Sequence, residues 1–207
     1  IEENTLKGML ANKKYLSELS NHRLFDLSIK IIYAKYDKGL KYIKDNDLFE
    51  YCPVYKKLFE IANKSYKLEE LFSLYYQKYQ EYPIEFPQMY KNLVIGVDEI
   101  IASNFSNYAM YKNQQYFNIA FNVAKVLKIN ANEQVIKFYN LPIKEDNDLA
   151  LSKFEISKYF KGRNISLAIK DIIKAILDNE IKNTKEDINI KIKELVKKYE
   201  EVTECLC

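Results

Sequence analysis

Glycine and proline are scarce, with four of each among the 207 residues. An all-β sandwich or barrel shows turn signals about every eight to twelve residues, and glycines supply many of those turns. Nucleotide-binding α/β enzymes need glycine-rich phosphate loops of the GxGxxG or GxxxxGK[ST] type. None of the four glycines stands in such a loop. The scarcity therefore argues against both of these fold classes.

Histidine and cysteine are also rare, which leaves few residues for metal or nucleophilic chemistry. His22 is the one histidine, and it follows Asn21 at an expected helix start, where a solvated histidine is ordinary. Cys205 and Cys207 have one residue between them, whereas structural zinc sites prefer two and need a second pair. We therefore predict no metal, no cofactor and no catalytic residue, and we lean towards a protein that is not an enzyme.

The third cysteine, Cys52, makes the cysteine count odd, which is unusual for a secreted domain held by disulfides. We expect a reducing compartment, the cytoplasm. The chain also lacks a run of about 18 apolar residues, so we expect a soluble protein without a membrane span. It begins with Ile1 rather than Met, and one hypothesis is that it is part of a longer protein.

Charge of one sign does not accumulate anywhere along the chain. The net charge is +3, from 32 basic and 29 acidic residues, and the two signs alternate. Arginine is limited to Arg23 and Arg163, although arginine supplies the bidentate contacts to phosphates and bases. This pattern makes nucleic acid an unlikely partner, and we keep it as the third of three hypotheses.

What the chain does have is apolar residues at three- and four-residue spacing through every long segment, which predicts about nine or ten helices. The expected helices cover residues 3–19, 22–36, 54–65, 67–82, 89–103, 114–129, 132–139, 148–160, 165–181 and 185–202. Residues 93–97 could also form a buried strand, but the pattern continues through them without a turn. The fold class is therefore all-α, an irregular stack of antiparallel helical hairpins similar to an α-solenoid.

Helix ends and layers follow from a few polar and turn-forming residues. Thr184 suits the N-cap of the last helix, Gly162 a helix C-terminus, and Asn164 the N-cap of the helix after it. Pro83 and Pro87 interrupt the helical pattern. We take that break as the boundary between an N-terminal layer, 1–82, and a C-terminal layer, 83–207, within one continuous domain.

Two segments, 116–131 and 162–179, resemble the second half of a tetratricopeptide repeat. In that family a small residue after the first helix leads into a helix with small residues seven apart. Ala168 and Ala175 match this pattern and are preceded by Gly162, while Ile119 and Val126 occupy the equivalent places in the other segment. The resemblance implies an array of α-hairpins with a concave groove that binds protein.

Tyrosine and asparagine gather in the middle of the chain. Tyr75, Tyr79 and Tyr82 share one helical face by their spacing, and we expect their hydroxyls to be exposed along a groove. Tyrosine is enriched in binding hot spots, and asparagine can grip a peptide backbone. The other interpretation is that these tyrosines only fill helix interfaces. The candidate binding residues are Tyr75, Tyr79, Tyr82, Tyr108, Tyr111, Asn107 and Asn118.

Three functional hypotheses remain after these observations. The first is a helical interaction domain that binds a protein or peptide segment and has no enzymatic activity. The second is an accessory or substrate-recognition domain of a larger enzyme, one that handles sugars or nucleotides. The third is a helical nucleic-acid-binding protein.

Overall fold

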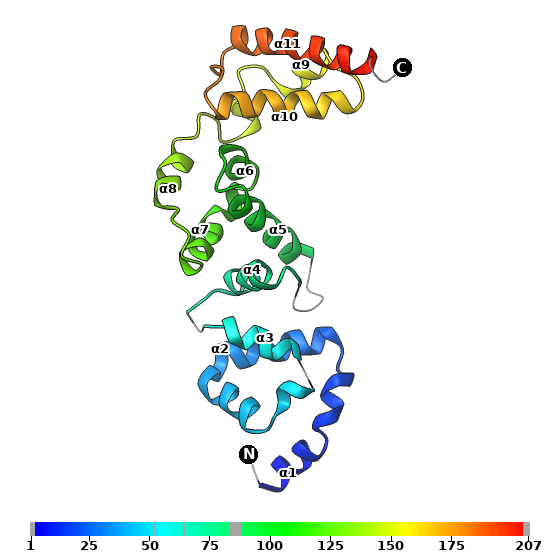
Figure 1. The fold of residues 1–207 in the computed structure, drawn as a ribbon, viewed down its shortest axis with the longest axis vertical. Helices are drawn as coiled ribbons and strands as arrows, with labels where there is room; N and C mark the ends of the chain where they lie inside the picture. Colours follow the sequence, from blue (N-terminus) through cyan, green and yellow to red (C-terminus); the bar gives the residue numbers. More distant parts are fainter. Residues whose placement is uncertain (1–2, 52, 64, 83–87, 205–207) are drawn as a thin grey trace. The chain divides into compact units, whose positions relative to one another are not determined.

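The computed structural model describes residues 3–51, 53–63, 65–82 and 88–204, and within these ranges it is all-α, which confirms the predicted fold class. Eleven α-helices and no strand occur in the described residues, and residues 93–97 lie within a helix (Figure 1). The helices are α1 Glu3–Ala11, α2 Asn21–Asp45, α3 Pro53–Ile61, α4 Leu68–Tyr79, α5 Gln88–Ala102, α6 Asn107–Lys112, α7 Phe117–Val126, α8 Asn132–Tyr139, α9 Lys153–Ser157, α10 Arg163–Leu177 and α11 Lys185–Glu204. None of these described helices is long and apolar enough to cross a bilayer.

The chain divides into two compact units. The first unit contains residues 1–101 and 116–129, and the second contains residues 102–115 and 130–207. Each unit is therefore assembled from two stretches of chain. The break proposed from the prolines lies in residues 83–87, outside the described residues, and the layers 1–82 and 83–207 stay a prediction.

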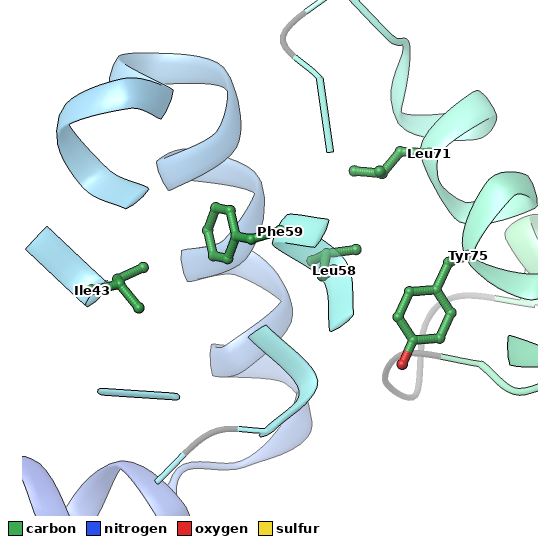
Figure 2. Packing of buried hydrophobic residues seen from close by; sticks show 5 residues of the cluster. All are labelled: Ile43, Leu58, Phe59, Leu71 and Tyr75. Carbon is green, nitrogen blue, oxygen red and sulfur yellow. The ribbon is translucent and has the colours of Figure 1, made fainter. Parts of the chain in front are cut away.

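The core of the first unit brings α2, α3 and α4 together. Figure 2 shows Leu58 and Phe59 of α3 between Ile43 of α2 and two residues of α4, Leu71 and Tyr75. All five side chains are buried. Because α4 contacts α3 and also α7, it is covered on two sides and buries six consecutive residues, 70–75.

A buried carboxylate ties α4 to α7. One oxygen of Glu70 accepts a hydrogen bond from the backbone N–H of Lys67 at 2.9 Å, which closes the first turn of α4. The other oxygen accepts from the Asn122 side-chain amide of α7 at 2.7 Å. A buried carboxylate is costly unless its oxygens have donors, and both oxygens of Glu70 have one.

Helix α4 is shorter than expected. The predicted helix over 67–82 ends at Tyr79, because Gln80 adopts a left-handed backbone conformation with φ 54°. Tyr82 consequently lies beyond the helix, and its ring packs against Tyr76, with the two centroids 5.3 Å apart. The prediction that Tyr82 shares a helical face with Tyr75 and Tyr79 is therefore wrong.

The predicted helix over 148–160 is also wrong in extent, since only Lys153–Ser157 is α-helical. Asp148 ends a short 3₁₀ turn, and its carboxylate accepts the backbone N–H groups of Lys144 and Glu145 at 2.8 and 2.9 Å. These bonds close the turn and offer the backbone an alternative to a helix. The helix then starts afresh at Ser152, whose hydroxyl accepts from the Glu155 N–H.

In the second unit, α10 packs against α6, α9 and α11. Figure 1 shows α10 and α11 running antiparallel as a hairpin. Ala168 and Ala175 of α10 are buried, with 0% and 3% of their surface exposed. Small side chains at such positions let helices approach closely. The resemblance to tetratricopeptide hairpins and a solenoid-like stack of hairpins both stay predictions.

At the ends of this hairpin, one predicted helix cap is confirmed and two predicted roles are wrong. The Thr184 hydroxyl accepts from the Asp187 N–H at 3.2 Å, which confirms the predicted cap of α11. The predictions that Gly162 ends a helix and that Asn164 is an N-cap are wrong, because Asn164 is the second residue of α10. Gly162 immediately precedes Arg163, the first residue of α10, and its φ of 53° is the reason for a glycine there.

Enlarging Ala175 should destabilise the protein. Ala175→Leu adds three carbons at a buried position, and overpacking of this kind costs about 1–3 kcal/mol of unfolding free energy. Ala102→Leu, the same change at an exposed position, should stay within about 0.5 kcal/mol of the parent. Urea unfolding followed by circular dichroism measures both variants. Equal stability of the two would contradict close packing at Ala175.

Candidate functional site

The three tyrosines predicted to form a binding face differ in burial. Tyr75 has no exposed surface, and its hydroxyl donates to a Glu81 carboxylate oxygen at 3.1 Å. Burial, followed by the bond to Glu81, raises the pKa of Tyr75 well above its usual range. The Tyr79 hydroxyl donates to Glu60 at 2.9 Å, and its ring lies 4.8 Å from that of Tyr75.

The expectation that Tyr75 exposes its hydroxyl is therefore wrong, because the core against α3 covers that side of α4. Tyr79 is half-buried and packs against the same core, and Tyr82 is 36% exposed. For Tyr75 the structure supports the alternative interpretation, that of a tyrosine filling a helix interface.

The candidate asparagines also have different roles. Asn107 donates from its side-chain amide to the Leu177 carbonyl oxygen at 2.9 Å and to the Asp178 carboxylate at 3.3 Å. It thereby caps the last turn of α10 from α6. Asn118 is exposed on α7 in the first unit. The seven candidates are thus divided between the two units and do not form one surface within either.

Two of the candidates, Tyr108 and Tyr111, do share a hollow in the second unit. It has a volume of about 610 Å³ and lies among α6, the 3₁₀ turn at 146–148, α9 and α10. The residues that line it are Tyr108, Tyr111, Lys112, Gln114, Lys144, Glu145, Asp146, Lys153, Ser166, Ile169, Lys170 and Ile173. We call this space the hollow.

Asp146 holds one wall of the hollow together. Its two oxygens accept hydrogen bonds from the Tyr111 hydroxyl and from the Lys153 ammonium group, each at 2.5 Å. The bond from Lys153, followed by that from Tyr111, lowers the pKa of Asp146. Burial and the bond to Asp146 raise the pKa of Tyr111 above its usual range. At neutral pH the wall therefore combines a carboxylate, a neutral phenol and an ammonium ion.

Helix α10 adds positive charge at the hollow, where Lys170 belongs to the lining and Lys174 lies next to Tyr108 outside the lining. The ammonium groups of Lys170 and Lys174 lie 5.7 and 5.3 Å from the centroid of the Tyr108 ring. The two lysines are one helical turn apart, and the ring attracts both through its negative face. Ile169 and Ile173 form a second row one position earlier, and this row gives the hollow an apolar side.

Sequence reasoning missed the lysines and Asp146 as parts of a site. The spacing of Lys170 and Lys174 was a visible signal, but the segment containing Asp146 was interpreted only as a turn. Tyr111 and Asp146 are separated by 35 residues, a distance that no local periodicity reports.

The residues rejected as catalytic or metal-binding gain no new role. His22 is exposed and lies 3.9 Å from Asp26 one helical turn away. Cys52, Cys205 and Cys207 lie outside the described residues. In the described part of the chain, no group of three or more histidine, cysteine, aspartate or glutamate residues is arranged to hold a metal.

Removing the Tyr111 hydroxyl should raise the pKa of Asp146. Tyr111→Phe deletes one of the two donors, so the pKa should move towards its ordinary value of 3.8 but stay below it, because Lys153 remains. The stability that this carboxylate contributes is present above its unfolded-state pKa and is lost as the pH falls through the folded-state pKa. The variant should therefore show a weaker loss of stability in acid.

Carbon-detected NMR titration of the Asp146 carboxyl group measures this shift directly. Tyr159→Phe is the matched control, since Tyr159 is exposed on the surface of the same unit and does not line the hollow. An unchanged pKa in Tyr111→Phe would show that the phenol does not stabilise the carboxylate.

Truncating Asn107 should loosen the end of α10. Asn107→Ala leaves the Leu177 carbonyl without its side-chain donor and should cost about 1 kcal/mol of unfolding free energy. Asn118→Ala, an identical change at an exposed helical position, should alter stability by less than about 0.5 kcal/mol. Thermal unfolding of the two variants compares them. A stable Asn107→Ala protein would show that water replaces the amide at no cost.

No protein-family model, curated protein or solved structure matches this chain. The likeness to tetratricopeptide hairpins therefore stays a resemblance carried by Gly162, Ala168 and Ala175.

Proposed function

We propose that this protein is a helical interaction module that binds a peptide segment of a partner protein in the hollow. The observation that carries the proposal is the hollow itself, a space of about 610 Å³ next to Tyr108 and Tyr111. Binding sites for small ligands commonly measure about 300–1,000 Å³, so the hollow has room for a few side chains of a peptide.

The lining of the hollow suits a peptide because it mixes apolar surface with hydrogen-bonding groups. Ile169 and the half-buried ring of Tyr108 offer apolar contact, and tyrosine is a common anchor residue at interfaces. Gln114 is exposed beside them and donates from its side chain to the Lys144 carbonyl at 3.0 Å. This bond holds the connection between α8 and α9 in place at the rim.

The ionisation states of the hollow favour binding over acid–base catalysis. A general acid or base works best when its pKa lies near the working pH. The shifts at Asp146 and Tyr111 run the other way, because the carboxyl pKa is lowered and the phenol pKa is raised. Neither group exchanges a proton readily near pH 7, whereas both keep fixed charges and donors that can orient a ligand.

The hairpin formed by α10 and α11 and the resemblance to tetratricopeptide hairpins support the same proposal, since tetratricopeptide hairpins present grooves to peptides.

The proposed location is the cytoplasm, which the odd number of cysteines supports.

Filling the hollow should abolish peptide binding while the fold is kept. Linear peptides are first selected from a phage-displayed random library on the full chain. Ser166 is an exposed residue of α10 that lines the hollow, so Ser166→Trp should place an indole in the space and weaken the selected peptides at least about tenfold.

Leu167→Trp is the matched control, because Leu167 is the next residue of α10, is exposed and does not line the hollow. Affinities for this variant should stay within about twofold of the parent. A library that yields no binder, or binders that tolerate Ser166→Trp as well as Leu167→Trp, would contradict the proposal.

A further inference from the structure

The charges around the hollow are unbalanced. Four lysines and two acidic residues line it, although the whole chain carries a net charge of only +3. One of the acidic residues, Asp146, is already paired with Lys153 and with the Tyr111 hydroxyl. The lining therefore holds two more positive than negative side chains, and a ligand with negative charge would complement it.

Lys170 and Lys174 are positioned to receive such a ligand. Both are exposed on α10, and the Tyr108 ring lies close to their ammonium groups. A contact with an aromatic face restricts where an ammonium group lies but does not consume its N–H donors. Holding the two side chains near the ring lowers the entropy that they lose when a carboxylate binds.

The two rows of α10 also set a spacing for the ligand. Residues four apart in a helix are about 6.0 Å apart along the axis, and alternate residues of an extended peptide are about 6.6–6.8 Å apart. Successive side chains of an extended peptide point to opposite sides. A peptide lying along α10 could thus direct every second side chain to the lysine row, and the side chains between them to Ile169 and Ile173.

We infer that the hollow recognises a peptide segment in which acidic residues alternate with aliphatic ones. This inference rests on the proposed function and names the class of its ligand. The carboxylates pair with Lys170 in the lining and with Lys174 just outside it, and the aliphatic side chains lie against the half-buried Ile169, since Ile173 is only 4% exposed.

A nucleic acid fits the hollow less well than an acidic peptide. Glu145 and Asp146 belong to the lining and repel phosphates, and the lining contains no arginine. Carboxylates spaced along a peptide can approach the lysines and avoid the acidic wall.

The test uses the full chain and fluorescently labelled synthetic peptides, measured by anisotropy. The main probe alternates Glu with Val, and three comparison peptides replace Glu by Gln, replace Val by Ser, or place all Glu residues before all Val residues. The alternating Glu–Val peptide should bind at least about tenfold more tightly than each of the three.

Charge reversal on the protein provides the second arm. Lys170→Glu should weaken the Glu–Val peptide at least about tenfold and make a Lys–Val peptide the better ligand. Lys161→Glu, an exposed lysine outside the lining, controls for the change in net charge and should leave the preference unchanged. Melting temperatures equal to that of the parent show that both variants are folded.

The outcomes separate this inference from the proposed function. If the selected peptides bind in the hollow but the Glu–Val and Gln–Val peptides bind equally, the inference is overturned and the proposed function stands. If no peptide binds in the hollow, the inference and the proposed function are both overturned. If a thymidine oligonucleotide binds in a Lys170-dependent manner and the Glu–Val peptide does not, the ligand is a nucleic acid and the inference is overturned.

Discussion

The close packing of α10 is the constraint on which the second unit depends. The helix packs against α6, α9 and α11, and its buried residues include Ala168 and Ala175. The small side chains let the neighbours approach, and the approach fixes which residues of α10 remain outside. Lys170 and Ile169 stay outside and line the hollow. The core and the candidate site are thus two sides of one helix, and the position of the first determines the geometry of the second.

In the first unit the corresponding role falls to α4, which α3 and α7 cover on two sides. The buried carboxylate of Glu70 shows how polar groups are used inside this unit, because one of its oxygens accepts a hydrogen bond from Asn122, 52 positions away in the chain. Tyr75 follows the same logic, since its hydroxyl is bonded to Glu81 and its ring completes the core. The polar groups named here hold the first unit together through hydrogen bonds between its own residues.

Local features of the structure could be predicted from the sequence, and features that join distant segments could not. The periodicity of α11 and the cap at Thr184 depend on neighbouring residues, and both were predicted. The spacing of Tyr75 and Tyr79 showed that they share a face, but it carried no information on whether α3 covers that face. The end of α4 was misplaced because Gln80 adopts a conformation that glycine or asparagine more often marks. Tyr111 and Asp146 meet through tertiary structure alone, so the hollow had no signature in any single segment.

The connection between α8 and α9 has a consequence for how the protein folds. Its bonds reach far along the chain, since the side chain of Asn183 accepts the Ala150 N–H and donates to the Asp148 carbonyl across 33 and 35 residues. Closing such long loops costs conformational entropy before the contacts between their ends form. The α10–α11 hairpin joins neighbouring segments, so its loop costs less entropy to close. The hairpin should therefore appear early on the folding pathway and the hollow late. A partly unfolded molecule would keep most of its helix and lose the hollow first, so the proposed binding of a peptide would require complete folding.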